Sequence, residues 1–158
     1  MNRFHLLLLV GFSLALSACG STTSGAPTAT ITLTPDPCTG FALGESVKPI
    51  NDLQREFDDT SALAANLPRE QLGDAIINLQ RIRRAAEDVS PPACLNTLKA
   101  HQLKHMNAVI DTLIAFVGGA DTATLNSGME QARESHDLYA LELARLLGAT
   151  LVPNTKTP

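Results

Sequence analysis

Hydrophobic side chains recur at helical spacing in four segments of the chain after residue 38. These segments run from about Pro49 to Asn66, Pro68 to Asp88, Pro91 to Val117 and Thr122 to Leu147. In each segment apolar residues return every three or four positions, which gathers them on one face of a helix. The third segment has the richest apolar stripe: Leu95, Leu98, Leu103, Met106, Val109, Ile110, Leu113, Phe116 and Val117. We therefore predict four amphipathic helices, with the third at the centre of the core.

Proline, glycine and capping residues indicate where each helix begins and ends. Pro49 suits the first position of the first helix, and Ser90, which precedes two prolines, is expected to cap the third. Gly118–Gly119 is expected to end the third helix, Asp121 to cap the fourth and Gly148 to end it. The connections are short, which favours antiparallel neighbours. We predict an all-α fold, an antiparallel up-down-up-down four-helix bundle over residues 38–148.

The segments on either side of the predicted bundle differ from it in composition. Residues 19–37 are rich in Ser, Thr, Ala, Gly and Pro, with Asp36 as the only charge. Such a stretch has too few apolar side chains to form a core, so we predict a flexible, disordered linker. Residues 149–158 are predicted to be a disordered tail. Roughly 110 residues remain between these segments, which is enough for one hydrophobic core and not for two domains.

The N-terminal residues have the pattern of a targeting segment. Arg3 precedes an uncharged apolar run from Leu6 to Ser17, which is too short for a membrane-spanning helix. The run ends in Leu16-Ser17-Ala18-Cys19, which resembles the lipobox of bacterial lipoprotein precursors. The resemblance covers residues 1–19 only. It implies that residues 1–18 are a cleaved signal peptide and that a lipid on Cys19 anchors the protein to a membrane outside the cytoplasm, at the cell surface or in the periplasm. The alternative is an ordinary secretory signal cleaved near Ala18.

The cysteine count fits this interpretation. The chain has three cysteines, and if lipid occupies Cys19, then Cys38 and Cys94 remain as a pair. An exported protein meets an oxidising environment, so we predict a disulfide between them. In the predicted topology, the starts of the first and third helices lie at the same end of the bundle, which would bring these two residues together. The alternative is a pair of buried free thiols.

Histidines are the only candidate ligands for a cofactor. His136 falls near the middle of the fourth apolar stripe, level with His101 and His105 on the neighbouring helix. His101 and His105 are four residues apart, a spacing that allows two imidazoles to bind one transition metal or a haem. The carboxylates of Asp58, Asp74 and Glu134 lie at broadly similar heights. Against this, the chain lacks the Glu-x-x-His pairs of di-metal bundles and the Cys-x-x-Cys-His motif of covalent haem.

We therefore favour a protein without a cofactor, in which His136 is a hydrogen-bonded core residue and His101 and His105 lie on a wetted flank. A pH-sensitive role for His136 is a further alternative. A second polar feature is a set of cations near the linker end of the predicted bundle: Arg81, Arg83, Arg84, Lys99 and Lys104. They suit the C-terminal end of a helix dipole, or they contact anionic lipid head groups.

Composition and motifs exclude several classes of function. The net charge is −4 and tryptophan is absent, which gives no case for nucleic-acid binding. The chain has no Gly-rich phosphate loop and no nucleophile elbow, and the consecutive residues Ser135-His136-Asp137 point in different directions on a helix. We expect a non-enzymatic binding or interaction module of the cell envelope, with an envelope protein as a candidate partner. The alternative is a metal- or haem-binding bundle that uses His101, His105 and His136.

Overall fold

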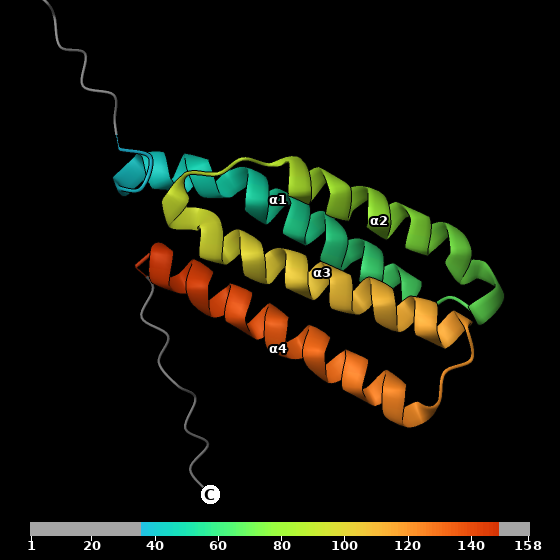
Figure 1. Cartoon of the computed structure of the whole chain (residues 1–158). Coiled ribbons are helices and arrows are strands. Elements are labelled where there is room, and N and C mark those ends of the chain that lie inside the picture. The colour runs from blue at the N-terminus through green and yellow to red at the C-terminus, as the bar shows by residue number, and fades with distance from the viewer. Residues whose placement is uncertain (1–35, 149–158) are drawn as a thin grey trace, which may run out of the picture. The chain divides into compact units, whose positions relative to one another are not determined.

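The structure, a computed structural model, describes residues 36–148 as an all-helical bundle. It contains four α-helices: α1 (Gly40–Ala64), α2 (Leu72–Asp88), α3 (Asn96–Val117) and α4 (Thr122–Leu146). Short 3-10 helices, Arg69–Gln71 and Ala93–Leu95, precede α2 and α3. Successive helices are antiparallel and lie side by side (Figure 1). The predicted antiparallel four-helix bundle is confirmed.

Several predictions concern residues outside this range. The signal peptide, the lipidated Cys19, the linker up to residue 35 and the tail 149–158 all lie outside the described residues. They stay predictions. Within residues 36–148, no helix combines the length and the apolar character that crossing a membrane requires.

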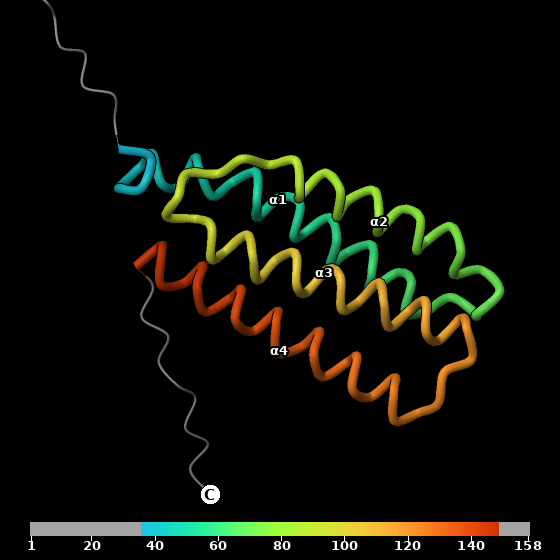
Figure 2. The backbone as a smooth tube through the Cα atoms, viewed as in Figure 1, coloured from blue at the N-terminus to red at the C-terminus, as the bar shows by residue number. Residues whose placement is uncertain are grey.

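The four helices do not pack symmetrically. α1, α2 and α3 pack against one another, and α4 packs along the length of α3. α1 and α4 are not close neighbours, and Figure 2 shows α3 running between them. The bundle is thus a three-helix cluster with a fourth helix attached to one of its members.

The hydrophobic core consists of three clusters of buried side chains along the bundle axis. The first contains Leu43, Val47, Ile50, Leu95, Leu98 and Tyr139. The second contains Phe57, Leu79, Ile82, Ala86, Met106 and Ile110. The third contains Ala64, Leu72 and Ile76. Residues of α3 belong to the first two clusters, in agreement with its rich apolar stripe.

The first helix begins at Gly40, and the prediction that it begins at Pro49 was wrong. Pro49 lies inside α1, where it has no N–H to donate to the carbonyl oxygen four residues earlier. Leu43 and Val47, on the turns before it, are buried in the first cluster. Burying two such side chains stabilises a fold by about 3–6 kcal/mol, against a cost of about 3 kcal/mol for an interior proline. The helix therefore extends past the proline toward Cys38.

The predicted ends of the fourth helix are close to the observed ones. Asp121 caps α4, and its Oδ1 accepts a hydrogen bond of 2.8 Å from the backbone N–H of Thr124. The helix ends at Leu146, and Gly148 follows with a φ of 69°. Glycine adopts this left-handed conformation without the steric cost that a Cβ brings.

The connection between α2 and α3 differs from the prediction. Ser90 does not cap the third helix: the chain enters a 3-10 turn after Pro92, and no side chain caps that turn. The connection is instead held by Lys99 of α3, whose Nζ donates hydrogen bonds to the backbone carbonyl oxygens of Glu87 and Val89. A cation at the C-terminal end of α2 also suits its dipole.

The predicted disulfide is confirmed. Cys38 and Cys94 are bonded, with their Cα atoms 6.1 Å apart. Cys38 lies just before α1 and Cys94 lies in the 3-10 turn before α3. The bond thus joins the starts of two parallel helices. We call this the disulfide end of the bundle, and the opposite end, where α1 and α3 finish, the distal end.

Candidate functional site

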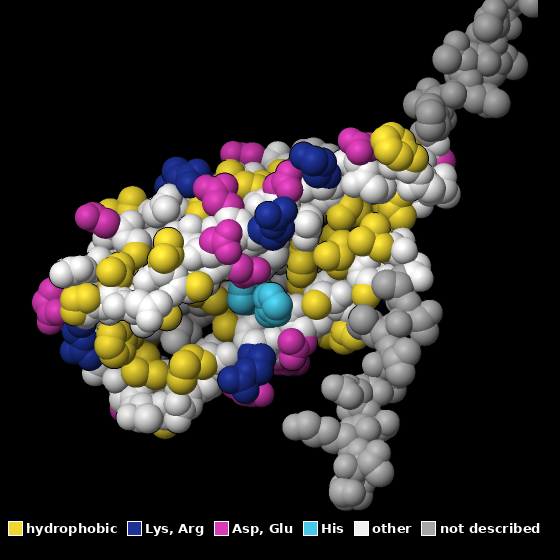
Figure 3. Space-filling view, turned by 180° about the vertical axis from the view of Figure 1, so that it is seen from behind, with side chains coloured by type: hydrophobic (Ala, Val, Ile, Leu, Met, Phe, Trp, Pro, Cys, Tyr) yellow, Lys and Arg dark blue, Asp and Glu magenta, His cyan; other side chains and the backbone are white. Residues whose placement is uncertain are grey.

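An apolar groove opens between α1 and α4 toward the distal end, where α4 packs on α3. Its volume is about 430 Å³, within the range of small-molecule pockets. We call it the distal groove. Its lining residues come from α3 at the floor and from the two flanking helices: Ser61, Ala65, Val109, Thr112, Leu113, Phe116, Leu125, Met129 and Ala132. Figure 3 shows hydrophobic side chains around this hollow, next to histidine side chains.

The two hydroxyl groups in the lining do not make the distal groove polar. Ser61 Oγ donates a hydrogen bond of 2.9 Å to the carbonyl oxygen of Asp58. Thr112 Oγ1 donates one of 2.6 Å to the carbonyl oxygen of Ala108. Both hydroxyl protons are therefore used within their own helices. The groove offers a ligand a surface that is almost entirely apolar.

The position of α4 depends on a close approach to α3 at one glycine. A Cβ placed on Gly128 would lie 2.2 Å from Thr112 Oγ1, far inside van der Waals contact. One turn further along α4, Ala132 is buried, and Ser135 follows with no exposed surface. Gly128, Ala132 and Ser135 thus form a strip of small residues that lets α4 lie close to α3.

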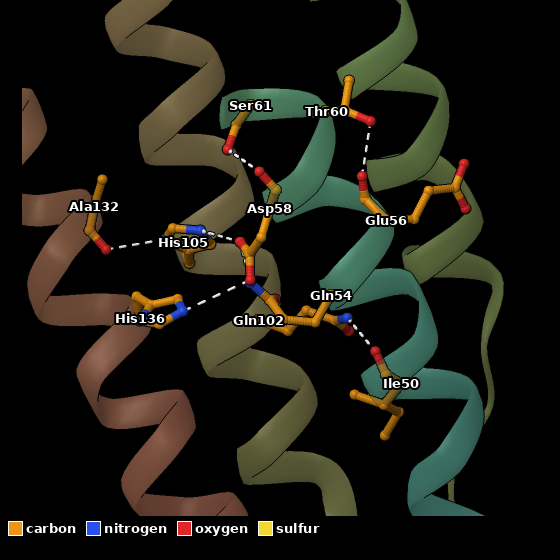
Figure 4. Close-up of polar contacts among 10 residues, drawn as sticks. All are labelled: Ile50, Gln54, Glu56, Asp58, Thr60, Ser61, Gln102, His105, Ala132 and His136. Carbon is orange, nitrogen blue, oxygen red and sulfur yellow. Dashed lines mark hydrogen bonds and ion pairs between the residues drawn. The ribbon is translucent and has the colours of Figure 1, made fainter. Parts of the chain in front are cut away.

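A layer of polar side chains borders the distal groove on the side of the disulfide end. We call it the polar layer, and it consists of Gln54 and Asp58 on α1, Gln102 and His105 on α3, and Ser135 and His136 on α4. Figure 4 shows how the side chains of Asp58, His105 and His136 meet between α1, α3 and α4, with Gln54 and Gln102 beside them. Gln102 Nε2 donates a hydrogen bond of 2.7 Å to the carbonyl oxygen of Ile50, which ties α3 to α1. The polar layer separates the groove from the apolar cluster at the disulfide end.

His105 is the buried centre of the polar layer, with 7% of its surface exposed. Its Nδ1 lies 3.0 Å from the carbonyl oxygen of Ala132, and its Nε2 lies 3.2 Å from Asp58 Oδ1. A carbonyl oxygen and a carboxylate both accept hydrogen bonds, so the ring satisfies both partners only when both nitrogens carry protons. The His105 ring is therefore paired with the carboxylate of Asp58 on one side and with the backbone of α4 on the other. This pair links all three of α1, α3 and α4.

The two carboxylate oxygens of Asp58 have different hydrogen-bond partners. Oδ1 accepts hydrogen bonds from His105 and from Gln54 Nε2, the latter at 2.9 Å. Oδ2 lies 3.6 Å from His136 Nε2 and accepts no hydrogen bond within residues 36–148. Burial opposes the ionisation of Asp58, but the hydrogen bonds from His105 and Gln54 and the charges of the two histidines outweigh it. Together they hold the pKa of Asp58 below its usual value.

A second polar contact links α1 and α4 further toward the disulfide end. Tyr139 Oη lies 3.3 Å from Asn51 Oδ1 and donates a hydrogen bond to it. Burial raises the pKa of the Tyr139 phenol, and the charge of Asp58 raises it further. The phenol is therefore a permanent donor at ordinary pH. Beyond the polar layer, this bond adds a second polar link between α4 and α1, next to the apolar cluster that contains Tyr139.

The structure brings together two of the three histidines predicted as metal ligands. The rings of His105 and His136 are 5.1 Å apart, but His101 lies on another part of α3, where its charge acts on Glu142. No group of three His, Cys, Asp or Glu side chains within residues 36–148 is placed to hold a metal ion. Asp58 is the one predicted carboxylate that the structure places beside His105 and His136.

The burial of two histidines differs from the prediction. His136 was expected in the core, but 44% of its side chain is exposed at the edge of the polar layer. His105 was expected on a wetted flank and is buried. The reason is the rotation of α4. His136 lies on the side of α4 that faces Asp58 of α1, at the half-exposed edge of the polar layer.

Several of the cations that were predicted near the disulfide end form ion pairs or hydrogen bonds within the protein. Arg81 forms an ion pair of 2.6 Å with Glu56 of α1, and Arg83 forms one of 2.6 Å with Glu87. Lys99 holds the connection between α2 and α3, as described above. These three cations have partners within the protein, which weakens the prediction that they bind lipid head groups.

Comparisons with known proteins do not connect this chain to a characterised relative. No protein-family model, no curated protein and no solved structure matches it. The distal groove and the polar layer are therefore the observations from which function can be inferred.

Proposed function

We propose that this protein is a lipid-anchored, extracytoplasmic binding module of the cell envelope that holds an apolar ligand in the distal groove. The groove is the observation that carries the binding role. It is large enough for a small molecule, its lining is apolar, and its hydroxyl protons are already used. The sequence of residues 1–19 supports the anchor, because a lipobox places the rest of the chain on a membrane tether.

We propose binding without catalysis because the polar groups near the groove already form hydrogen bonds within the protein. Both ring nitrogens of His105 face acceptors of the protein itself. Ser135 Oγ donates to the carbonyl oxygen of Gln131, and Ser61 Oγ to that of Asp58. A catalytic nucleophile needs a base within hydrogen-bond reach. Neither of these serines has its hydroxyl proton directed to a histidine, so the arrangement favours a binding role.

Filling the distal groove tests the proposed binding role. Ala65 lines the groove and Ala62 does not, although both are exposed alanines at the end of α1. We expect the neutral apolar dye Nile red to bind the wild-type protein with an increase in fluorescence. Ala65→Phe should weaken this binding about tenfold or more by occupying the site, whereas Ala62→Phe should leave it unchanged. Equal binding by both variants would contradict the assignment of the groove.

The anchor is tested separately by fractionation of cells that express the full chain. We expect the wild-type protein in the membrane fraction and labelled by radioactive palmitate. Cys19→Ala should abolish the label and release the protein from the membrane. If Cys19→Ala stays membrane-bound through the same washes, the lipoprotein interpretation is wrong. The groove assignment would be unaffected by that result.

An envelope protein is a second kind of partner for such a module, and it would insert an apolar side chain into the same groove. The Ala65→Phe and Ala62→Phe pair distinguishes this case as well. A protein partner that is crosslinked to the wild type should be lost with Ala65→Phe and kept with Ala62→Phe.

A further inference from the structure

We propose that the ligand of the distal groove is a neutral amphiphile with one hydroxyl group, and that the hydroxyl binds between Asp58 and His136. This inference rests on the proposed function and deepens it. The apolar part of the ligand fills the groove, and the head group reaches the polar layer. The ligand class is an alcohol with a long or bulky hydrocarbon part.

The groove and the polar layer are contiguous. Ser61 and Ala132 are lining residues on the two flanking helices. Ser61 Oγ is bonded to the backbone of Asp58, and the carbonyl oxygen of Ala132 is bonded to the ring of His105. His136 lies one turn beyond Ala132 on α4. The lining residues at this end of the groove thus lie within about one helical turn of Asp58 and His136, which is within reach of the head group of a bound amphiphile.

Asp58 provides an acceptor at this point. Its Oδ1 already accepts two hydrogen bonds, whereas Oδ2 accepts none from residues 36–148. The Asp58 side chain is 36% exposed, so Oδ2 can be reached from the opening between α1 and α4. A carboxylate oxygen in a half-buried position favours a hydrogen-bond donor, and such charge-assisted bonds are among the stronger ones.

His136 provides the complementary group. Its Nε2 lies 3.6 Å from Asp58 Oδ2, too far for a direct hydrogen bond, and 44% of its side chain is exposed. A hydroxyl oxygen placed at the mouth of this gap can donate its proton to Oδ2 and accept one from Nε2. A hydroxyl is suited to both contacts because it is donor and acceptor at once. A methyl ether in the same place has no proton to donate and leaves the carboxylate oxygen unpaired.

The charges around the gap favour a neutral head group. Asp58 presents a carboxylate at the gap, and its Oδ1 already accepts hydrogen bonds from His105 and Gln54. An anionic head group would be repelled by Asp58, which is its nearest neighbour at the gap. An ammonium head group would have no lone pair with which to accept a hydrogen bond from His136 Nε2. A hydroxyl makes both contacts and carries no charge.

The test compares decanol with decyl methyl ether as competitors of Nile red. The protein is residues 19–158 with Cys19→Ala, exported so that the disulfide forms and purified without detergent. This protein contains all of the described residues, 36–148. We expect decanol to displace the dye at a concentration about tenfold or more below that of the ether. Equal displacement overturns the hydroxyl assignment but leaves the groove as an apolar site. Failure of Nile red itself to bind overturns the proposed function together with this inference.

Two histidine variants locate the head group. His136→Phe keeps a ring at the edge of the polar layer but removes both nitrogens. It should reduce the preference for decanol over the ether to about threefold or less, while the affinity for the ether stays unchanged. His101→Phe, on the part of α3 near Glu142, should leave both affinities unchanged. A preference that survives in His136→Phe would overturn the proposed position of the hydroxyl.

Asp58→Asn gives a second measurement of the same contact. It keeps the size of the side chain and removes the carboxylate charge, so the preference for decanol should fall while the ether still binds. Circular dichroism should show an unchanged helix content. If the variant is folded and keeps the full preference for the alcohol, Asp58 is not the acceptor.

Discussion

Gly128 of α4 and Thr112 of α3 approach so closely that no side chain fits between the two helices at this point. A Cβ on Gly128 would lie 2.2 Å from Thr112 Oγ1 and 3.2 Å from Thr112 Cβ. Thr112 is also a lining residue of the distal groove. The same contact therefore positions α4 and shapes the proposed binding site.

Gly128→Ala should destabilise the protein, although alanine is the better helix former. The added methyl group pushes α4 away from α3 or breaks the hydrogen bond of Thr112 to Ala108. We expect the free energy of unfolding in urea to fall by about 1–3 kcal/mol. Thr112→Ala in the same chain should restore part of it, since the clashing oxygen is then absent. A Gly128→Ala protein more stable than wild type would contradict the close approach.

Removal of His105 tests how much the His105–Asp58 pair contributes to the stability of the protein. In His105→Leu, Asp58 keeps Gln54 as a hydrogen-bond donor but loses the imidazole ring. Because Asp58 is partly exposed, we expect a loss of about 1–3 kcal/mol in the free energy of unfolding. Adding Asp58→Asn removes the unmatched charge, so the double variant should lose less than the sum of the two single variants. Additive losses would show that the pair is not coupled.

The protein should lose stability in acid through Asp58. The pKa of Asp58 is lower in the folded protein than in the unfolded chain, where it is about 3.9. The unfolded state therefore takes up the proton first as the pH falls. The stabilisation is fully present above about pH 5 and is lost below about pH 4, as the pH falls toward the folded pKa. Urea unfolding at pH 7 and at pH 3 should show this loss.

Asp58→Asn should reduce the difference in stability between pH 7 and pH 3. Glu142→Gln is the matched control on α4, since the pKa of Glu142 is also lowered, chiefly by its hydrogen bond from Arg145. Glu142 lies apart from the polar layer. Each substitution should therefore remove only the part of the pH-dependent stability that comes from its own carboxylate. An unchanged pH dependence in Asp58→Asn would show that the carboxylate gains nothing from its histidine partners.

Reduction of the disulfide should lower the stability of the whole bundle. Cys38 and Cys94 are separated by 56 positions. Closing a loop of this length is worth about 4 kcal/mol on the chain-entropy model. We expect a lower melting temperature in the presence of a reductant. The double variant Cys38→Ser and Cys94→Ser should melt at this lower temperature and should not respond to reductant. If the melting temperature of the wild type is the same with and without reductant, the assignment of the disulfide is wrong.

The sequence predicted the fold well because helix number and order depend on local signals. The apolar stripes, the glycines at Gly118–Gly119 and the cap at Asp121 are each readable within a few residues. The start of α1 was missed because it depends on a tertiary effect. Pro49 suggests a helix start, but the burial of Leu43 and Val47 against other helices extends α1 beyond it.

The candidate site was only partly predictable. The sequence placed His105 and His136 at one height, and the structure confirms that their rings are neighbours. It could not give the rotation of each helix, and this decides that His105 is buried and that His136 is half exposed. The distal groove was missed entirely. The small residues Gly128, Ala132 and Ser135, at helical spacing on α4, were the available signal, since they allow close packing on one neighbour.

The Cys38–Cys94 disulfide also determines how mechanical force passes through the molecule. A pull applied between the N-terminal and C-terminal parts of the chain crosses from Cys38 directly to Cys94 through the covalent bond. α1 and α2 lie inside the closed loop and carry no tension along their backbones. Only α3 and α4 lie on the loaded path. A tethered protein under tension would therefore first separate α4 from α3, the interface that forms one wall of the groove, while the rest of the bundle stays covalently closed.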